Sequence, residues 1–271
     1  MLNNLTMKRS ITILLLAVYS PGKAKQTPVT DSCVVTCNDA MKADTVSANH
    51  VASPTIKLNK FANSYVKSYI KDNGKGLEKI KEQSKPGFKT IESIFIKYDI
   101  PVELKYLAVV ESNMNSKATS RVGAKGYWQF MPSTAITYGL KVKGKVDERT
   151  HQYKSTVAAA KYLRSLYDDL GDWLLVVAAY NSGPGYIYKA IKQSGSRDFW
   201  KLQSFLPKET RNHVKRFISI HYFFEGEGSE ATATKAEWNK YQKDLVTFAA
   251  VKTETVTPNT SAKRVISNEQ K

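Results

Sequence analysis

The sequence predicts a mainly α fold, and two apolar patterns carry that prediction. The first places apolar residues at helical spacing and ends on a carboxylate: Leu104, Leu107, Ala108 and Glu111. The second is the uninterrupted apolar run WLLVVAAY over residues 173–180. Because this run is hydrophobic on all sides, we expect a helix that passes through the centre of a domain. Both patterns indicate helices packed around one core.

Local signals set the ends of these helices. Pro101 is suited to the first helical position, where its missing N–H is not needed. Gly171 is expected to end one helix in a left-handed turn, and Asp172 to cap the next helix. A final helix is expected over residues 207–224, where apolar residues again share one face.

Glu111 is a candidate general acid because it prolongs an apolar stripe. If the stripe packs, the carboxyl is partly desolvated, and desolvation favours the protonated form that an acid catalyst needs. The spacing is equally compatible with a glutamate that ends a helix beside Ser112 and faces water. A polar loop follows, in which Gly123 and Gly126 permit close backbone approaches.

Four ordered blocks of sequence resemble the lytic transglycosylase family, and most of all its membrane-bound murein transglycosylase D type. The blocks cover roughly half the chain, which makes the likeness more specific than any single motif. They are Glu111-Ser112, GYWQFMPSTA from Gly126, AAYNSGPG from Ala178, and ETRN from Glu209. The resemblance implies a lysozyme-like helical domain of the goose-type lysozyme and transglycosylase kind, with Glu111 as the single catalytic acid.

The same resemblance implies a set of substrate-binding residues. Gln129 aligns with the residue that bonds the N-acetyl group of the sugar or holds the glutamate, and Tyr180 with a residue beside the catalytic carboxyl. Phe130 adds an aromatic face, and Ser112 and Asn181 directly follow Glu111 and Tyr180 in the sequence. The expected substrate contacts are therefore Ser112, Gln129, Phe130, Tyr180 and Asn181. The chain departs from the family at Tyr127-Trp128, where a Leu-Met pair is more usual, and at His213, where a tyrosine usually follows the ETRN block.

The implied reaction is non-hydrolytic cleavage of the bond between N-acetylmuramic acid and N-acetylglucosamine in the glycan strands of peptidoglycan. Glu111 would act first as acid and then as base, closing a 1,6-anhydro ring. Two alternatives stay open at this point. One is a hydrolase like goose-type lysozyme, with Asp147 as a second carboxylate, and the other is a catalytically silent glycan-binding protein. No cofactor is expected, and the cysteines and histidines show no metal-ligand spacing.

The chain of 271 residues, 42% of them hydrophobic, is long enough for one main domain with appendages. Lys8 and Arg9 precede a short apolar run, which predicts a secretory signal peptide rather than a membrane span. The predicted boundaries are a signal peptide at 1–24, a linker at 25–55, an N-terminal helical segment at 56–87, the catalytic domain at 88–225, and a basic, polar tail at 226–271.

The formal net charge of +17 favours an anionic partner. Export makes nucleic acid the poorest candidate, which leaves acidic cell-wall polymer or the membrane surface as possible attachments for a basic face. We therefore expect a periplasmic or envelope-associated protein. Cys33 and Cys37 are compatible with a short disulfide or with two free thiols.

Overall fold

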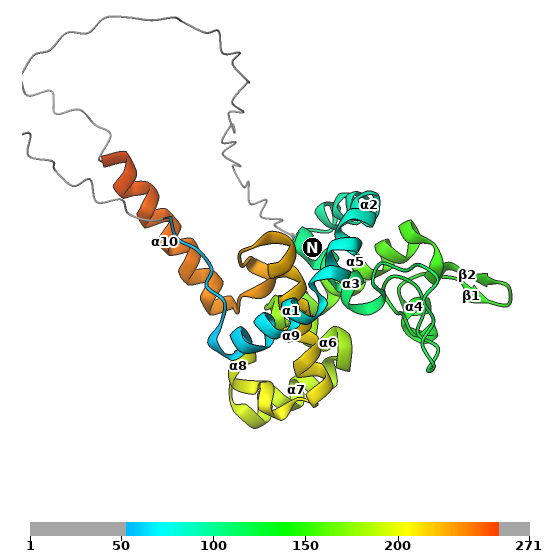
Figure 1. Ribbon diagram of the computed structural model, residues 1–271. Coiled ribbons are helices and arrows are strands. Elements are labelled where there is room, and N and C mark those ends of the chain that lie inside the picture. Colours follow the sequence, from blue (N-terminus) through cyan, green and yellow to red (C-terminus); the bar gives the residue numbers. More distant parts are fainter. Residues whose placement is uncertain (1–52, 255–271) are drawn as a thin grey trace, which may run out of the picture. The chain divides into compact units, whose positions relative to one another are not determined.

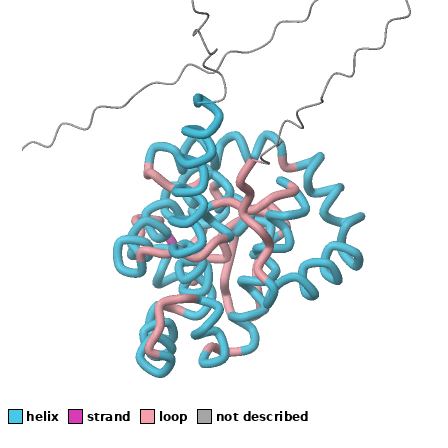
Figure 2. The backbone as a smooth tube through the Cα atoms, turned by 90° about the vertical axis from the view of Figure 1, so that its left-hand side faces the viewer, coloured by secondary structure: helices cyan, strands magenta, loops and turns pink. Residues whose placement is uncertain are grey.

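A computed structural model of the chain describes residues 53–254, and most of this part is helical (Figure 2). The predicted signal peptide, nearly all of the linker and the two cysteines lie outside the described residues. Within residues 53–254, no helix combines the length and the apolar character that crossing a bilayer requires.

The elements follow one another as short and medium helices, interrupted once by a small hairpin (Figure 1). In the hairpin, Val142 pairs with Asp147 in an antiparallel register. The elements are α1 (Lys60–Gln83), α2 (Lys85–Lys97), η1 (Val102–Lys105), α3 (Tyr106–Ser112), α4 (Pro132–Thr137), β1 (Val142–Lys143), β2 (Val146–Asp147), η2 (Glu148–Thr150), α5 (Gln152–Leu170), α6 (Trp173–Ser182), α7 (Pro184–Ser194), α8 (Phe199–Leu202), η3 (Gln203–Phe205), α9 (Lys208–Glu225), η4 (Glu230–Thr232) and α10 (Lys235–Glu254).

Helix α6 lies at the centre of the core, as its apolar sequence predicts. Every residue from Trp173 to Ala179 is buried, and the helix packs against α5, α7 and α9. The predicted end signals are also confirmed. Gly171 ends α5 with φ of 67°, and Asp172 caps α6 by accepting hydrogen bonds from the backbone N–H groups of Leu174 and Leu175. This cap fixes where the buried helix begins.

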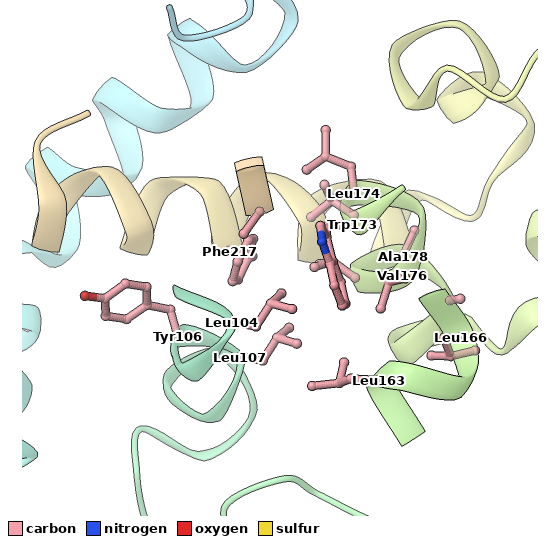
Figure 3. Packing of buried hydrophobic residues seen from close by; sticks show 14 of the residues in the cluster. Leu104, Tyr106, Leu107, Leu163, Leu166, Trp173, Leu174, Val176, Ala178 and Phe217 are labelled. Atoms are coloured by element: carbon pink, nitrogen blue, oxygen red, sulfur yellow. The ribbon is translucent and has the colours of Figure 1, made fainter. Parts of the chain in front are cut away.

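The core side chains come from elements that are far apart in the sequence (Figure 3). Leu104 of η1 and Leu107 of α3 face Phe217 of α9, and Leu163 of α5 completes the group with residues of α6. All of these side chains are fully buried. The packing holds α3 against α9, which sets the position of the residue that ends α3.

The start of the Glu111 helix differs from the prediction. Pro101 is extended (φ −53°, ψ 126°) and precedes a 3₁₀ turn, η1, so the α-helical part begins only at Tyr106. Short 3₁₀ turns commonly open α-helices, and this one still keeps Leu104 and Leu107 on the buried side. The apolar face of the prediction is therefore correct although its first turn is tighter.

Helix α1 packs along α9 through Ala62, Val66 and Leu77 (Figure 1). At the other end, the segment after Glu225 contains η4 and α10 and bonds to the helical body. The backbone N–H of Lys235 donates to Asp172 Oδ2 at 2.7 Å. These contacts show ordered structure within the predicted tail, and its boundaries remain a prediction.

Candidate active site

Glu111 lies in the last turn of α3, where the buried face of the helix reaches the surface. Leu107 and Ala108, one turn before it, are fully buried, whereas the Glu111 side chain is 16% exposed. Its Oε1 lies 2.8 Å from His213 Nε2 of α9. Asn113 then ends the helix in a left-handed conformation (φ 52°). The carboxyl is therefore largely shielded from water and opens to one side only.

That side is a cleft of about 350 Å³. It brings together five of the predicted site residues, Glu111, Gln129, Phe130, Tyr180 and Asn181, whereas Ser112 does not line it. The other lining residues come from the loop after α3 and from α4, α5 and α9. They are Ser120, Val122, Ala124, Met131, Thr134, Tyr162 and Glu209.

Arg149 holds the loop that carries Gln129 and Phe130. Its side chain is buried, and Nη1 donates to the carbonyl oxygens of Gly123 (2.7 Å) and Phe130 (2.9 Å). Asp147 orients the guanidinium by accepting from Nε at 2.9 Å and Nη2 at 2.8 Å. These hydrogen bonds from Arg149 hold the pKa of the Asp147 carboxyl well below its usual range. Asp147 is thus a charged structural residue of the loop and does not line the cleft.

Tyr180 joins α6 to the same loop. Its hydroxyl donates to the carbonyl oxygen of Trp128 at 2.7 Å, and the Trp128 indole N–H donates to Thr156 Oγ1 at 3.1 Å. Burial, together with the negative charge of Glu111, raises the pKa of Tyr180 well above its ordinary value. Tyr180 is therefore a neutral hydrogen-bond donor that fixes the backbone beside Gln129.

Gln129 has a left-handed backbone (φ 45°) and bonds to its own loop. Its Nε2 donates to the carbonyl oxygens of Gly126 (2.8 Å) and Ala118 (3.3 Å). Within residues 53–254, its Oε1 accepts no hydrogen bond and Gln129 makes none to Glu111. The amide oxygen is therefore the part of this side chain that can receive a ligand at the cleft.

Ser112 and Asn181 are held by neighbouring elements. Ser112 Oγ lies 3.0 Å from the carbonyl oxygen of Tyr127 and 3.1 Å from that of Ala108, which ties the end of α3 to the loop. Asn181 Oδ1 accepts from Thr210 Oγ1 at 2.9 Å, so its amide nitrogen is left for the cleft. The described part of the chain contains no group of three or more His, Cys, Asp and Glu side chains suited to a metal ion.

Sequence reasoning did not select two residues that the structure brings to the site, Glu209 and His213 of α9. Glu209 lines the cleft, and His213 contacts Glu111 directly. The two are four residues apart, a spacing that places both on one face of a helix. That spacing could have indicated that His213 points to the same side of the last predicted helix as Glu209.

Comparison with known proteins finds similarity over the middle of the chain. Residues 95–203 match the family model described as Transglycosylase SLT domain. Over 131 residues, the chain is 44% identical to membrane-bound lytic murein transglycosylase D of Escherichia coli K12. The aligned region covers 46% of this chain and 28% of that protein. Over 145 residues, it is 31% identical to the soluble lytic murein transglycosylase of Salmonella typhimurium, covering 49% of this chain and 22% of that protein.

A solved structure supports the fold. The 70-kDa soluble lytic transglycosylase in complex with bulgecin A matches with a TM-score of 0.50 and 23% identity, over 66% of this chain and 30% of that one. The chain thus spans less than a third of each of these proteins. The predicted mainly helical, lysozyme-like fold is confirmed, and the match of residues 95–203 to the Transglycosylase SLT domain agrees with the predicted resemblance to lytic transglycosylases.

Proposed function

We propose that this protein cleaves the β-1,4 bond between N-acetylmuramic acid and N-acetylglucosamine in peptidoglycan without consuming water, leaving 1,6-anhydro-muramoyl ends. The observation that carries the proposal is the position of Glu111, a shielded carboxyl that opens only onto a cleft lined by Gln129, Phe130, Tyr180 and Asn181. Several relatives of the chain are named lytic murein transglycosylases.

In the proposed mechanism Glu111 acts twice. In its acid form it donates a proton to the glycosidic oxygen, so that the bond from muramoyl C1 to that oxygen breaks and the N-acetylglucosamine end leaves as an alcohol. The acetamido group of the substrate stabilises the cationic C1. The Glu111 carboxylate then takes the proton of the C6 hydroxyl as O6 bonds to C1. Glu111 regains its proton, and the cycle closes.

The remaining cleft residues fit a sugar that carries an acetamido group. The Gln129 amide oxygen can accept a hydrogen bond and the Asn181 amide nitrogen can donate one, which matches the donor and acceptor of an acetamido group. Phe130, Tyr162 and Tyr180 form an aromatic group with ring centroids 5.3 to 6.3 Å apart. Their faces suit the C–H surfaces of sugar rings.

Glu209 gives hydrolysis a specific basis as the alternative reaction. Most glycosidases use two carboxylates, and Glu209 lines the same cleft as Glu111, whereas Asp147 is held by Arg149. Glu209 is exposed and lies in the first turn of α9. The two reactions give products that differ by one water molecule, so mass spectrometry separates them.

The test is digestion of purified sacculi followed by mass spectrometry of the released muropeptides. Wild type is expected to release anhydro products. Glu111→Gln should lower turnover about 10²–10⁴-fold, because an amide of the same shape cannot transfer the proton. Glu209→Gln is the matched control and should still yield anhydro products. Hydrated products from wild type would establish hydrolysis, and absence of any product would favour a silent binding protein.

The basic surface supports attachment to the anionic cell envelope, in keeping with the predicted export. Helix α1 carries a set of lysines that are exposed in the structure, namely Lys60, Lys67, Lys71, Lys75 and Lys79. Exposed charges are screened over about 10 Å at 0.1 M salt. Co-sedimentation with sacculi should therefore weaken as salt rises, while cleavage of short soluble glycan chains changes much less. Salt-independent sedimentation would argue against this role of the lysines.

A further inference from the structure

The contact between His213 and Glu111 gives the site a feature that the proposed mechanism does not use. His213 lies one turn after Glu209 on α9, and its side chain is only 5% exposed. Its Nε2 lies 2.8 Å from Glu111 Oε1, a normal hydrogen-bond distance. The two residues are 102 positions apart in the sequence, so the packing of α9 against α3 makes this contact.

The surroundings of the imidazole indicate which nitrogen carries the hydrogen. His213 Nδ1 is buried and has no hydrogen-bond partner within residues 53–254. A hydrogen on Nδ1 would be a buried donor without an acceptor, which folded proteins rarely contain. The missing acceptor disfavours both the Nδ1–H tautomer and the imidazolium, since each carries that hydrogen. The remaining form is the neutral ring with its hydrogen on Nε2, which donates to Glu111 Oε1.

A donor at Nε2 constrains the carboxyl of Glu111 in both of its forms. In the carboxylate, Oε1 accepts the hydrogen bond. In the carboxylic acid, the hydrogen bond from Nε2 favours the acid proton on Oε2, because Oε1 is then the carbonyl oxygen, which is a better acceptor than the oxygen of an O–H. The nearby hydroxyl of Tyr180 does not compete, since it donates to the carbonyl oxygen of Trp128. Oε2 is therefore the atom left to exchange protons across the cleft.

We propose that His213 is a positioning residue which, as the Nε2–H tautomer, reserves Oε1 of Glu111 as an acceptor and makes Oε2 the proton-carrying atom in both steps of the reaction. This inference rests on the proposed function. It assigns His213 no proton transfer of its own. The side chain restricts the rotation of the Glu111 carboxyl and directs its proton toward the substrate.

The kinetic test compares two variants of His213. His213→Leu removes the donor and should lower kcat about 10- to 100-fold, the effect of losing a hydrogen bond to a charged group, while KM changes less than about 3-fold. His213→Gln keeps an N–H at a similar reach and should restore most of kcat. Urea unfolding of each variant reports whether it folds. An unchanged kcat in folded His213→Leu, or no recovery in folded His213→Gln, would overturn the inference.

A second test does not depend on activity or on any variant. Long-range ¹H–¹⁵N correlation spectra of the wild-type protein labelled at histidine distinguish Nε2–H, Nδ1–H and imidazolium rings. His213 should be a single neutral Nε2–H tautomer. The exposed His151 serves as a reference for an Nε2–H ring, because its Nδ1 accepts a hydrogen bond from the backbone N–H of Lys154 at 3.4 Å. An Nδ1–H tautomer or an imidazolium at His213 would contradict the inference.

The two failures can be told apart. If Glu111→Gln retains full turnover, the proposed function of Glu111 is wrong, whatever His213 does. If Glu111→Gln is inactive but folded His213→Leu turns over like wild type, the role of Glu111 stands and only the positioning role of His213 is lost.

Discussion

The loop that carries the cleft residues depends on one glycine, and replacing it is the sharpest test of how the site is built. Gly126 has φ of 82°, and a Cβ at this position would lie 2.0 Å from the carbonyl oxygen of Arg149. Gly123, three residues earlier, has φ of 88° and open space where its Cβ would stand. The two glycines therefore share the strained backbone, and only Gly126 adds a steric overlap.

The expected destabilisation follows from these two terms. A left-handed backbone costs an L-residue about 1–2 kcal/mol, which is the whole expected effect of Gly123→Ala. In Gly126→Ala the Arg149 backbone or the loop must move as well. This movement threatens the Gly126 N–H bond to Ala118 O (2.9 Å) and the Arg149 bonds to the loop, each worth about 0.5–1.5 kcal/mol. We expect a total loss of at least about 3 kcal/mol.

Urea unfolding of both variants measures the free energies, and digestion of sacculi measures turnover per folded molecule. Gly126→Ala should lose much of its turnover because Gln129 and Phe130 move with the loop, whereas Gly123→Ala should retain most of it. Equal destabilisation of the two variants would refute this reasoning. It would mean that the overlap between a Cβ at position 126 and the carbonyl oxygen of Arg149 is relieved without loss of free energy.

Two further predictions concern single polar groups. Tyr180→Phe should lower the free energy of unfolding by about 1–3 kcal/mol, because it leaves the carbonyl oxygen of Trp128 without its donor. The control is Tyr162→Phe, which should change it by no more than about 0.5 kcal/mol, because the Tyr162 hydroxyl makes no hydrogen bond within residues 53–254. Equal effects of the two variants in urea unfolding would contradict this prediction. Burial lowers the pKa of His221 from 6.5 to about 4. Between these pH values the folded state binds fewer protons than the unfolded chain. The free energy of unfolding should therefore fall by up to about 3 kcal/mol as the pH falls through this range. Burial raises the pKa of Asp172 to about 6, and this group therefore changes stability with pH in the opposite direction. Because wild type and His221→Gln both contain Asp172, the difference between their unfolding free energies isolates His221. This difference should decline from pH 6.5 to 4, and a constant difference would contradict the assignment.

Several features of the domain could be predicted from the sequence alone because their causes are local. The ends of α5 and α6 follow from Gly171, which tolerates a left-handed turn, and from Asp172, whose side chain caps the next helix. The buried course of α6 follows from a run without a polar face. The face that carries Glu111 follows from helical spacing. The prediction of the helix start at Pro101 was less accurate, since spacing does not distinguish a 3₁₀ turn from the first turn of an α-helix.

Only the tertiary structure decided what surrounds Glu111. Spacing left open whether this carboxyl faced water or a shielded site, and the answer depends on how α9 packs against α3. The same packing brings His213 to Glu111 across 102 residues, and the guanidinium of Arg149 holds a loop whose carbonyl oxygens lie 19 and 26 residues away. Hydrogen bonds between distant segments leave no periodic signal in the sequence. They depend on where the two segments lie in the folded domain and not on which residues are adjacent in the sequence.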